Sequence, residues 1–287
     1  MIGIVGGTGL YELGLDQAAW RTIESPFGAP SDAVLTGTLG GHGIAFLPRH
    51  GRGHKIPPHE INFRANIDVL KRAGVTSLLS ISAVGSLNVK LPPGTFVLVN
   101  QFVDRTLRGP KTFFGTGCVA HVSMAHPTCT RMMDALQVAG EDAELSIVRG
   151  GTYLAMEGPQ FSSFAESEMH RHLGCDVVGM TNMPEAKLAR EAELCYATVA
   201  MVTDFDCWHP DHDHVKVDDV VRVLLANAEH ARTLVRHAVP RLAQDRNAPC
   251  PRGCHRSLDN AILTAPASRD PALCASLSAI AGRVLKS

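Results

Sequence analysis

The stretch SLLSISAV at residues 77–84 is a nearly continuous run of apolar and small residues, as expected of a strand covered on both faces. Similar runs recur along the chain at 2–5 (IGIV), 44–48 (IAFLP), 95–103 (TFVLVNQFV), 176–180 (DVVGM) and 196–205 (YATVAMVTDF). Between them lie segments with helical spacing of apolar residues, at 58–74, 165–174, 184–194 and 217–242. This alternation predicts an α/β domain with a mostly parallel central sheet flanked by helices.

The pattern changes near residue 244, where the chain reads QDRNAPCPRGC. A further helix is expected to begin at Asp270 and Pro271, because aspartate caps helix N-termini well and proline fits the first helical turn. We therefore divide the chain into a domain of residues 1–243 and a C-terminal extension of residues 244–287 that carries this helix.

Composition narrows the class of protein. Of the 287 residues, 45% are hydrophobic and 19% are charged, which is enough apolar material for a large core. Lys and Arg number 27 against 28 Asp and Glu, so no strong field exists to attract nucleic acid or an anionic membrane. Residues 1–10 lack the basic region and cleavage site of a signal peptide. We expect a cytoplasmic protein with neither nucleic-acid nor membrane partners.

The sequence contains eight cysteines, most of them within apolar segments where a free thiol packs as a small hydrophobe. Cys250 and Cys254 differ because they lie in the Pro- and Gly-rich linker, where a turn could bring their sulfurs together. A disulfide or half of a zinc site is conceivable, but no second ligand pair follows at zinc spacing. The interpretation we favour is an incidental pair, with no metal site in the chain.

Small and donor-rich residues follow four of the predicted strands. The first strand runs into Gly6-Gly7-Thr8-Gly9, the second into PRHGRGH at 48–54, and the third into Ser82-Ala83-Val84-Gly85-Ser86, while Thr181 follows the strand at 176–180. Taken singly, these are equally well explained as a tight turn or a solvated basic loop. Ligands of open α/β sheets bind beyond the carboxyl ends of strands, so together the segments predict a site for a phosphate-sized anion.

The strand at 196–205 ends differently, in Thr203-Asp204-Phe205-Asp206. Carboxylates two residues apart on an extended segment point the same way, so their charges repel and one pKa is expected to rise. A protonated carboxyl of this kind can donate a proton to a leaving group. The alternative is a simple turn in which both carboxylates are solvated.

The run HPDHDH at 209–214 is rich in potential metal ligands. Because it is a polar loop containing proline, and metal-binding histidines usually come from rigid elements, a lid or a solvated surface loop is the favoured interpretation. Met180 is explained equally well by core packing or by contact with a sugar.

Six motifs now form a pattern: GGTG at 6–9, RHG at 49–51, NFRAN at 62–66, EGPQFSS-x-AE at 157–166, GMT-x-x-PE at 179–185 and TDFDCW at 203–208. In this order and spacing they resemble the trimeric purine nucleoside phosphorylase family, and within it the branch that acts on methylthioadenosine. The resemblance spans about Ile2 to Leu242 and does not extend to the tail. It implies a nucleoside phosphorylase-like fold with a mixed, mostly parallel sheet.

The resemblance implies that phosphate attacks C1′ of S-methyl-5'-thioadenosine, which releases adenine and 5-methylthioribose 1-phosphate. The residues implied for phosphate are Thr8, Arg49, His50, Ser82, Ala83 and Thr181. Met180 would lie under the ribose and Phe161 beside the base. Asp204, protonated, would bond N7 as the catalytic group, and Asp204 or Asp206 would accept from the 6-amino group. No metal or organic cofactor is implied, since phosphate is a co-substrate.

The resemblance also implies which nucleoside is the substrate. Relatives that act on 6-oxopurines resemble this chain but carry Asn at the position of Asp204 and Glu at that of Ser162, so the present pair points to adenine. The face formed by Val217, Val220 and Val221 is apolar where relatives preferring a 5′-hydroxyl carry His, and it would suit a methylthio group. His121 matches a position that reaches a neighbouring subunit's site in a homotrimer. Gly179 stands where relatives carry a larger residue, which would loosen the base pocket.

Three other interpretations of the function remain open. A 6-oxopurine nucleoside phosphorylase would share the phosphate site but differ at Asp204. A nucleoside-binding module without turnover, with or without a metal at 209–214, would leave the glycosidic bond intact. A hydrolytic nucleosidase would use water and would not need Arg49 and His50 together.

Overall fold

The computed structural model describes the chain except residues 8, 11–12, 211–216, 245–249 and 286–287, and except the side chains of 217, 219, 220 and 224. Eleven described strands form one sheet. They are β1 (Ile2–Gly6), β2 (Asp16–Arg21), β3 (Val34–Leu39), β4 (His42–Pro48), β5 (Ser77–Ser86), β6 (Phe96–Val99), β7 (Gln101–Asp104), β8 (Ile147–Arg149), β9 (Thr152–Ala155), β10 (Val177–Gly179) and β11 (Cys195–Asp204).

The sheet is mixed and mostly parallel, as predicted. β1 pairs in parallel with β4 and β5, and β11 runs parallel to β5 along almost its whole length. Antiparallel pairs join β2 to β3, β3 to β4, β6 to β11 and β10 to β5. β5 is the central strand, because β1, β10 and β11 all pair with it.

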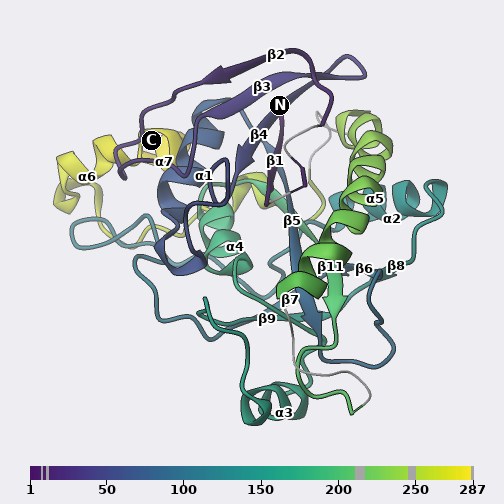
Figure 1. Ribbon diagram of the computed structural model, residues 1–287. Helices are drawn as coiled ribbons and strands as arrows, with labels where there is room; N and C mark the ends of the chain where they lie inside the picture. Colours follow the sequence, from purple (N-terminus) through teal and green to yellow (C-terminus); the bar gives the residue numbers. More distant parts are fainter. Residues whose placement is uncertain (8, 11–12, 211–216, 245–249, 286–287) are drawn as a thin grey trace.

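Helices cover the sheet on two sides (Figure 1). They are α1 (Phe63–Arg72), α2 (Thr130–Asp142), α3 (Phe164–His172), α4 (Asn182–Glu191), α5 (Val217–Gln244), α6 (Pro271–Ser276) and α7 (Ser278–Leu285), with 3-10 turns at Pro58–Glu60, Cys254–Arg256 and Pro266–Ser268. α1, α4 and α7 pack together on one side and α2 against α5 on the other. Among the described helices, none combines the length and apolar character needed to cross a membrane.

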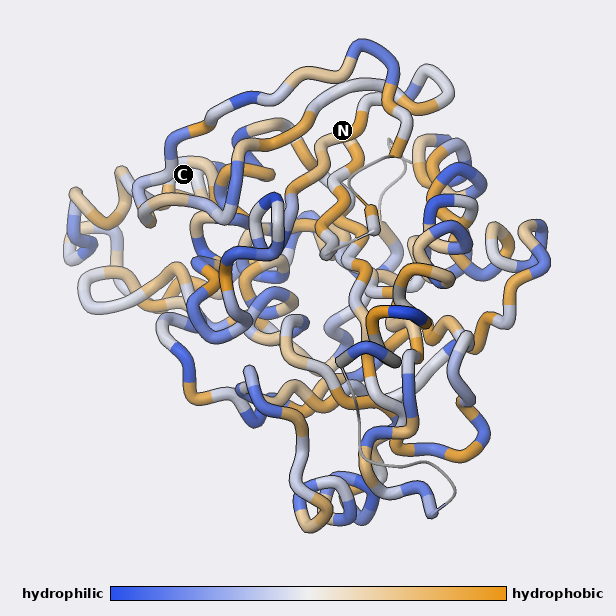
Figure 2. The backbone as a smooth tube through the Cα atoms, in the orientation of Figure 1, coloured by the Kyte–Doolittle hydropathy of each residue, from blue (hydrophilic) through white to orange (hydrophobic). Residues whose placement is uncertain are grey.

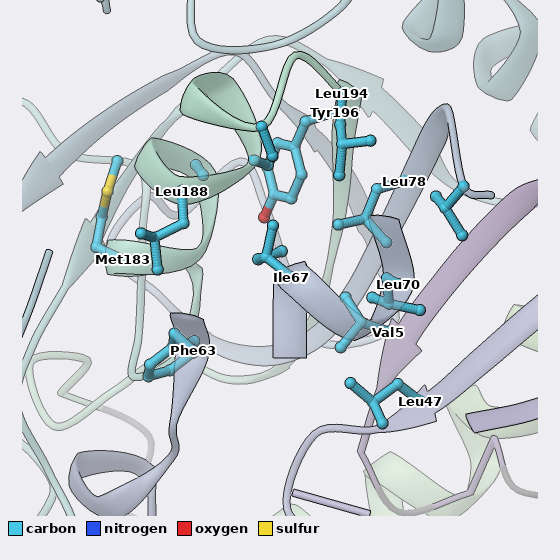
Figure 3. Close-up of a cluster of buried hydrophobic side chains, with 14 of the residues drawn as sticks. Val5, Leu47, Phe63, Ile67, Leu70, Leu78, Met183, Leu188, Leu194 and Tyr196 are labelled. Carbon is cyan, nitrogen blue, oxygen red and sulfur yellow. The ribbon is translucent and has the colours of Figure 1, made fainter. Parts of the chain in front are cut away.

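The described residues form two large hydrophobic cores, one on each side of the sheet, and a smaller third cluster around Phe205. Successive residues of β5 point to opposite faces, so Leu78 joins the core under α1 and α4 while Leu79 joins the one under α2 and α5. Figure 3 shows the first of these, with Leu78 near Leu70 and Ile67 of α1. In Figure 2 the central strands are mainly hydrophobic, whereas α5 carries hydrophilic turns on its outer side.

Several element boundaries differ from the prediction. The run 95–103 is two strands, β6 and β7, because the chain changes neighbours at Asn100: β6 pairs with β11 and β8, whereas β7 pairs with β9. The helix expected from residue 58 begins only at Phe63, where the Asn62 side chain accepts a hydrogen bond from the Ala65 N–H. The cap at Asp270 is confirmed, since its carboxylate accepts from the Leu273 N–H.

The C-terminal extension packs on the main domain. Leu277, Ile280 and Ala281 lie in the same core as Ile67 of α1. Arg283 forms an ion pair with Glu193, which precedes β11, with an N–O distance of 2.6 Å. This segment is therefore an integral part of the fold in the described structure.

Candidate active site

An opening in the sheet beside β5 defines the site. On one edge of this strand, β1 pairs only as far as Val5 with Ser80, and β10 joins at Gly85 with Val178. Among the described strands, none pairs with residues 81–84 on that edge, while β11 continues along the other. On this edge, the strand next to β5 therefore changes from β1 to β10 beside Ser82 and Ala83. Open α/β sheets bind their ligands at such a change of neighbouring strands.

A buried polar network lies under this opening. Arg49 is 1% exposed, and its Nε lies 2.9 Å from Oε2 of Glu185. Its Nη groups donate to Ser80 Oγ at 2.6 Å and to the Ile81 carbonyl at 3.0 Å. Glu185 also accepts from Ser80 and Tyr196. The sequence predicts that Arg49 directs its donors at an anion, but most of them bond these internal partners.

Two groups at the opening retain capacity for a ligand. Thr181 is buried, and its Oγ1 has no hydrogen-bond partner among the described residues. His50 is also buried, its Nδ1 lies 2.9 Å from the Ile56 carbonyl, and a side chain added at Gly7 would meet its Cδ2. Because the carbonyl can only accept, Nδ1 carries a proton and Nε2 is left at the tip of the ring. Ser82 lies beside them and donates to Asn182 Oδ1 at 3.3 Å.

The carboxylate pair lies at the end of β11, where Asp204 pairs with Gly85 on the other edge of β5. Burial raises the pKa of Asp204, and the charge of Asp206 adds to the shift as a smaller contribution. The predicted direction is thus confirmed, but burial rather than repulsion is the main cause. The geometry also differs, because Asp206 has a φ of 54° and its N–H donates to Asp204 Oδ1 at 2.8 Å. Asp206 is 5% exposed, and its Oδ2 is unpartnered among the described residues.

Two glycines, Gly85 and Gly179, determine the space available around the carboxylate pair. Gly85 pairs with Asp204, and a Cβ there would lie 3.0 Å from Asp204 Oδ1, so glycine permits the close approach of the carboxylate. Gly179 does not loosen the pocket as expected. A Cβ at Gly179 would lie 2.1 Å from the Tyr153 hydroxyl, so a buried tyrosine already fills that space.

The spacing along β5 suits a nucleoside. Gly85 is three positions after Ser82, which corresponds to about 10 Å along an extended strand. This distance leaves room for a sugar between an anion bound at Ser82 and a planar base bound at Asp204. Met180 follows β10 on the same side, and its carbonyl accepts from Arg108 at 2.9 Å.

Residues of α3 and the preceding loop lie beside the aspartate turn. Ser162 lies next to the aspartate turn, since its carbonyl accepts from the Cys207 thiol. Phe161 is 42% exposed. Ser167 Oγ and His170 Nδ1 are buried without a described partner, and the charge of Asp206 acts on His170. Sequence reasoning missed both residues, although the AESEMH segment that carries them was recognised as a helix.

Some predicted residues are not placed by the structure. Thr8 and most of the HPDHDH run lie outside the described residues, as do the side chains of Val217 and Val220. Val221 is exposed on α5. His121 is exposed on the domain surface, where its N–H donates to the Ala261 carbonyl of the C-terminal extension.

Comparison with known proteins identifies the family to which this chain belongs. The model of the phosphorylase superfamily matches residues 1–240. The chain belongs to this superfamily, in its methylthioadenosine phosphorylase family. It is 62% identical to the S-methyl-5'-thioadenosine phosphorylase of Rhodospirillum rubrum over 286 residues, which cover 99% of this chain and 97% of that protein.

Solved structures agree with this placement. A methylthioadenosine phosphorylase from an Antarctic soil metagenomic library superimposes with a TM-score of 0.91 at 43% identity, covering 97% of this chain and 98% of that one. The Schistosoma mansoni methylthioadenosine phosphorylase, in complex with adenine, gives a TM-score of 0.87 at 36% identity, covering 91% and 98%. Both the fold and the family implied by the sequence motifs are therefore confirmed.

The position of His50 leads to a testable pH effect. Burial lowers the pKa of His50 to about 4. A phosphate anion at Nε2 would favour the imidazolium, so we expect the pKa of His50 to rise when phosphate binds, with proton uptake. NMR titration of the imidazole signals with and without phosphate would measure the shift, and His50→Gln would assign the signal. A pKa of His50 that does not respond to phosphate would contradict its placement at the anion.

Proposed function

We propose that this chain catalyses the phosphorolysis of S-methyl-5'-thioadenosine to adenine and 5-methylthioribose 1-phosphate. The observation that carries the proposal is the arrangement along β5. Thr181 and His50 keep hydrogen-bonding capacity at one end of the opening, and Asp204 has a raised pKa at the other. The high identity to methylthioadenosine phosphorylases over the whole chain supports this choice among nucleoside substrates.

The chemistry follows from this arrangement. Phosphate held by Ser82, Ala83, Thr181 and His50 would lie against C1′, where it attacks and its charge stabilises the developing oxocarbenium ion. The leaving adenine accumulates negative charge, which a proton at N7 removes. Asp204 would hold that proton, because burial keeps its carboxyl protonated to higher pH than usual. Phosphate is the co-substrate, and Arg49 positions the strand ends through Glu185.

We further propose that the site is completed in a homotrimer. Phe161 and Phe164 are 42% and 63% exposed at the start of α3, and neighbouring exposed aromatic rings of this size are typical of an interaction surface. His121 is likewise exposed. Burial of these side chains against a neighbouring subunit would close the pocket. Sedimentation or light scattering of the purified protein would measure the assembly.

The decisive assay is release of adenine from methylthioadenosine with and without phosphate, beside hypoxanthine release from inosine. We expect adenine only with phosphate, and much faster than hypoxanthine, because a carboxyl can accept from the 6-amino group. Faster turnover of inosine would keep phosphorolysis but indicate a 6-oxopurine enzyme. Adenine release without phosphate would indicate a hydrolase, and release of neither base would contradict enzymatic function.

A further inference from the structure

Four cysteines that are distant in sequence meet on the side of the sheet covered by α2 and α5. The Sγ atoms of Cys129, Cys195, Cys250 and Cys254 all lie within 4.8 Å of one another. All four residues are at most 5% exposed and belong to one hydrophobic cluster. None of them takes part in the active site, because Cys195 begins β11 and Asp204 ends it, about 30 Å away along the strand.

The distances match one tetrahedral ion. Four thiolates around zinc, each about 2.3 Å from the metal, place their sulfurs about 3.8 Å from one another. The Cys129 and Cys250 sulfurs are 3.6 Å apart, and all six sulfur pairs fall within the 4.8 Å limit. Two disulfides would instead produce two pairs at bonding distance. A polynuclear iron–sulfur cluster would hold its cysteines much further apart.

The backbone holds the four ligands in place independently of any ion. Cys129 caps α2, and its N–H donates to the Tyr196 carbonyl at 2.7 Å, which ties it to the beginning of β11 beside Cys195. Cys250 and Cys254 are joined by a turn in which the Gly253 N–H donates to the Cys250 carbonyl. Gly253 adopts a φ of 61°, so the turn uses the conformation that glycine favours. Three residues between these two cysteines is also an accepted zinc spacing.

Charge around the cluster favours thiolates. Arg131 Nη2 lies 3.5 Å from Cys195 Sγ, so a guanidinium lies directly beside the buried sulfurs. A positive charge next to four buried cysteines favours the thiolate form that binds metal and is the kind of surrounding group that stabilises metal ligands.

We infer that Cys129, Cys195, Cys250 and Cys254 bind one structural zinc ion, which fixes the C-terminal extension to the beginnings of α2 and β11. Zn²⁺ replaces the four thiol protons, which are released to solvent, and no oxidation occurs. Zinc is chosen over iron(II) because thiolates in a tetrahedral set favour it and it stands higher in the series of divalent metal affinities. Sequence reasoning considered the CPRGC pair as half a site but looked for the second pair only downstream.

The test is zinc content of the full-length protein, purified without chelator after expression with added zinc. We expect about one zinc per chain and an X-ray absorption spectrum with four sulfur ligands at about 2.3 Å. Cys250→Ala/Cys254→Ala should lower the zinc content to less than about a tenth. The matched control is Cys118→Ala/Cys274→Ala, because these two thiols also contact one another but lie outside the cluster. It should retain the ion.

Other outcomes would overturn the inference. Absence of metal together with four fewer free thiols in the denatured, unreduced chain would show two disulfides. Iron in place of zinc would contradict the choice of metal. Full zinc content in Cys250→Ala/Cys254→Ala would show that the ion binds elsewhere in the protein. If that variant does not fold, the sulfur count from X-ray absorption of the unmodified protein still decides.

Discussion

Asp204→Asn is expected to lower kcat/KM for methylthioadenosine by about 100- to 1,000-fold, within the range typical of a lost general acid. The substitution keeps the size of the side chain and its acceptor oxygen, so the Asp206 N–H retains its partner. It removes the group whose pKa is raised by burial and replaces it with an amide that cannot give a proton to N7. Parallel assays of methylthioadenosine and inosine would measure the effect.

The ratio of kcat/KM for methylthioadenosine to kcat/KM for inosine is the more informative result. An amide can donate to O6 of a 6-oxopurine, so inosine should lose far less activity than methylthioadenosine, or gain. Thr203→Val is the matched control, because it keeps the carboxyl but removes the 2.7 Å hydrogen bond that lowers the pKa of Asp204. It should retain turnover and shift the pKa of Asp204 upward in the pH profile. An unchanged substrate preference in Asp204→Asn would contradict the proton-donor role.

Much of the fold could be predicted because its central elements carry strong local signals. β5 and β11 are buried along most of their length, and their sequences are correspondingly rich in apolar and small residues. β2, β3, β8 and β9 were missed. All six residues of β2 are exposed, so it lacks the buried apolar run of a central strand, and β8 and β9 have only three and four residues. The missed strands are held by pairing with neighbours, which a single sequence does not reveal.

The site was predictable to a similar extent. Residues that follow strands could be listed, because the carboxyl ends of strands are where α/β sheets bind ligands. Their partners could not, because Glu185 and Tyr196 meet Arg49 only through the tertiary fold. The same limit applies to the cysteine cluster, whose two halves come from different parts of the chain. Sequence patterns therefore locate the groups, and packing determines which of their donors remain available.

Arg49→Met is expected to reduce the free energy of unfolding by about 3–5 kcal/mol, the usual cost of leaving one partner of a buried ion pair without the other. Glu185 is buried with Arg49, and the variant would leave its carboxylate with only Ser80 and Tyr196 as donors. Urea unfolding at a fixed protein concentration would measure the change. Arg149→Met is the matched control, since its pair with Asp134 is exposed and should contribute about 1 kcal/mol or less.

A second variant separates the ion pair from the site above it. Arg49→Met/Glu185→Leu removes both charges, so it should recover part of the lost stability, because an apolar pair leaves no buried charge. It should not recover affinity for phosphate, since Val5 of β1 and Ser80 and Ile81 of β5 lose the guanidinium that joins them. We therefore expect a raised KM for phosphate with a smaller change for the nucleoside. Full recovery of the phosphate KM in the double variant would mean that Arg49 serves stability alone.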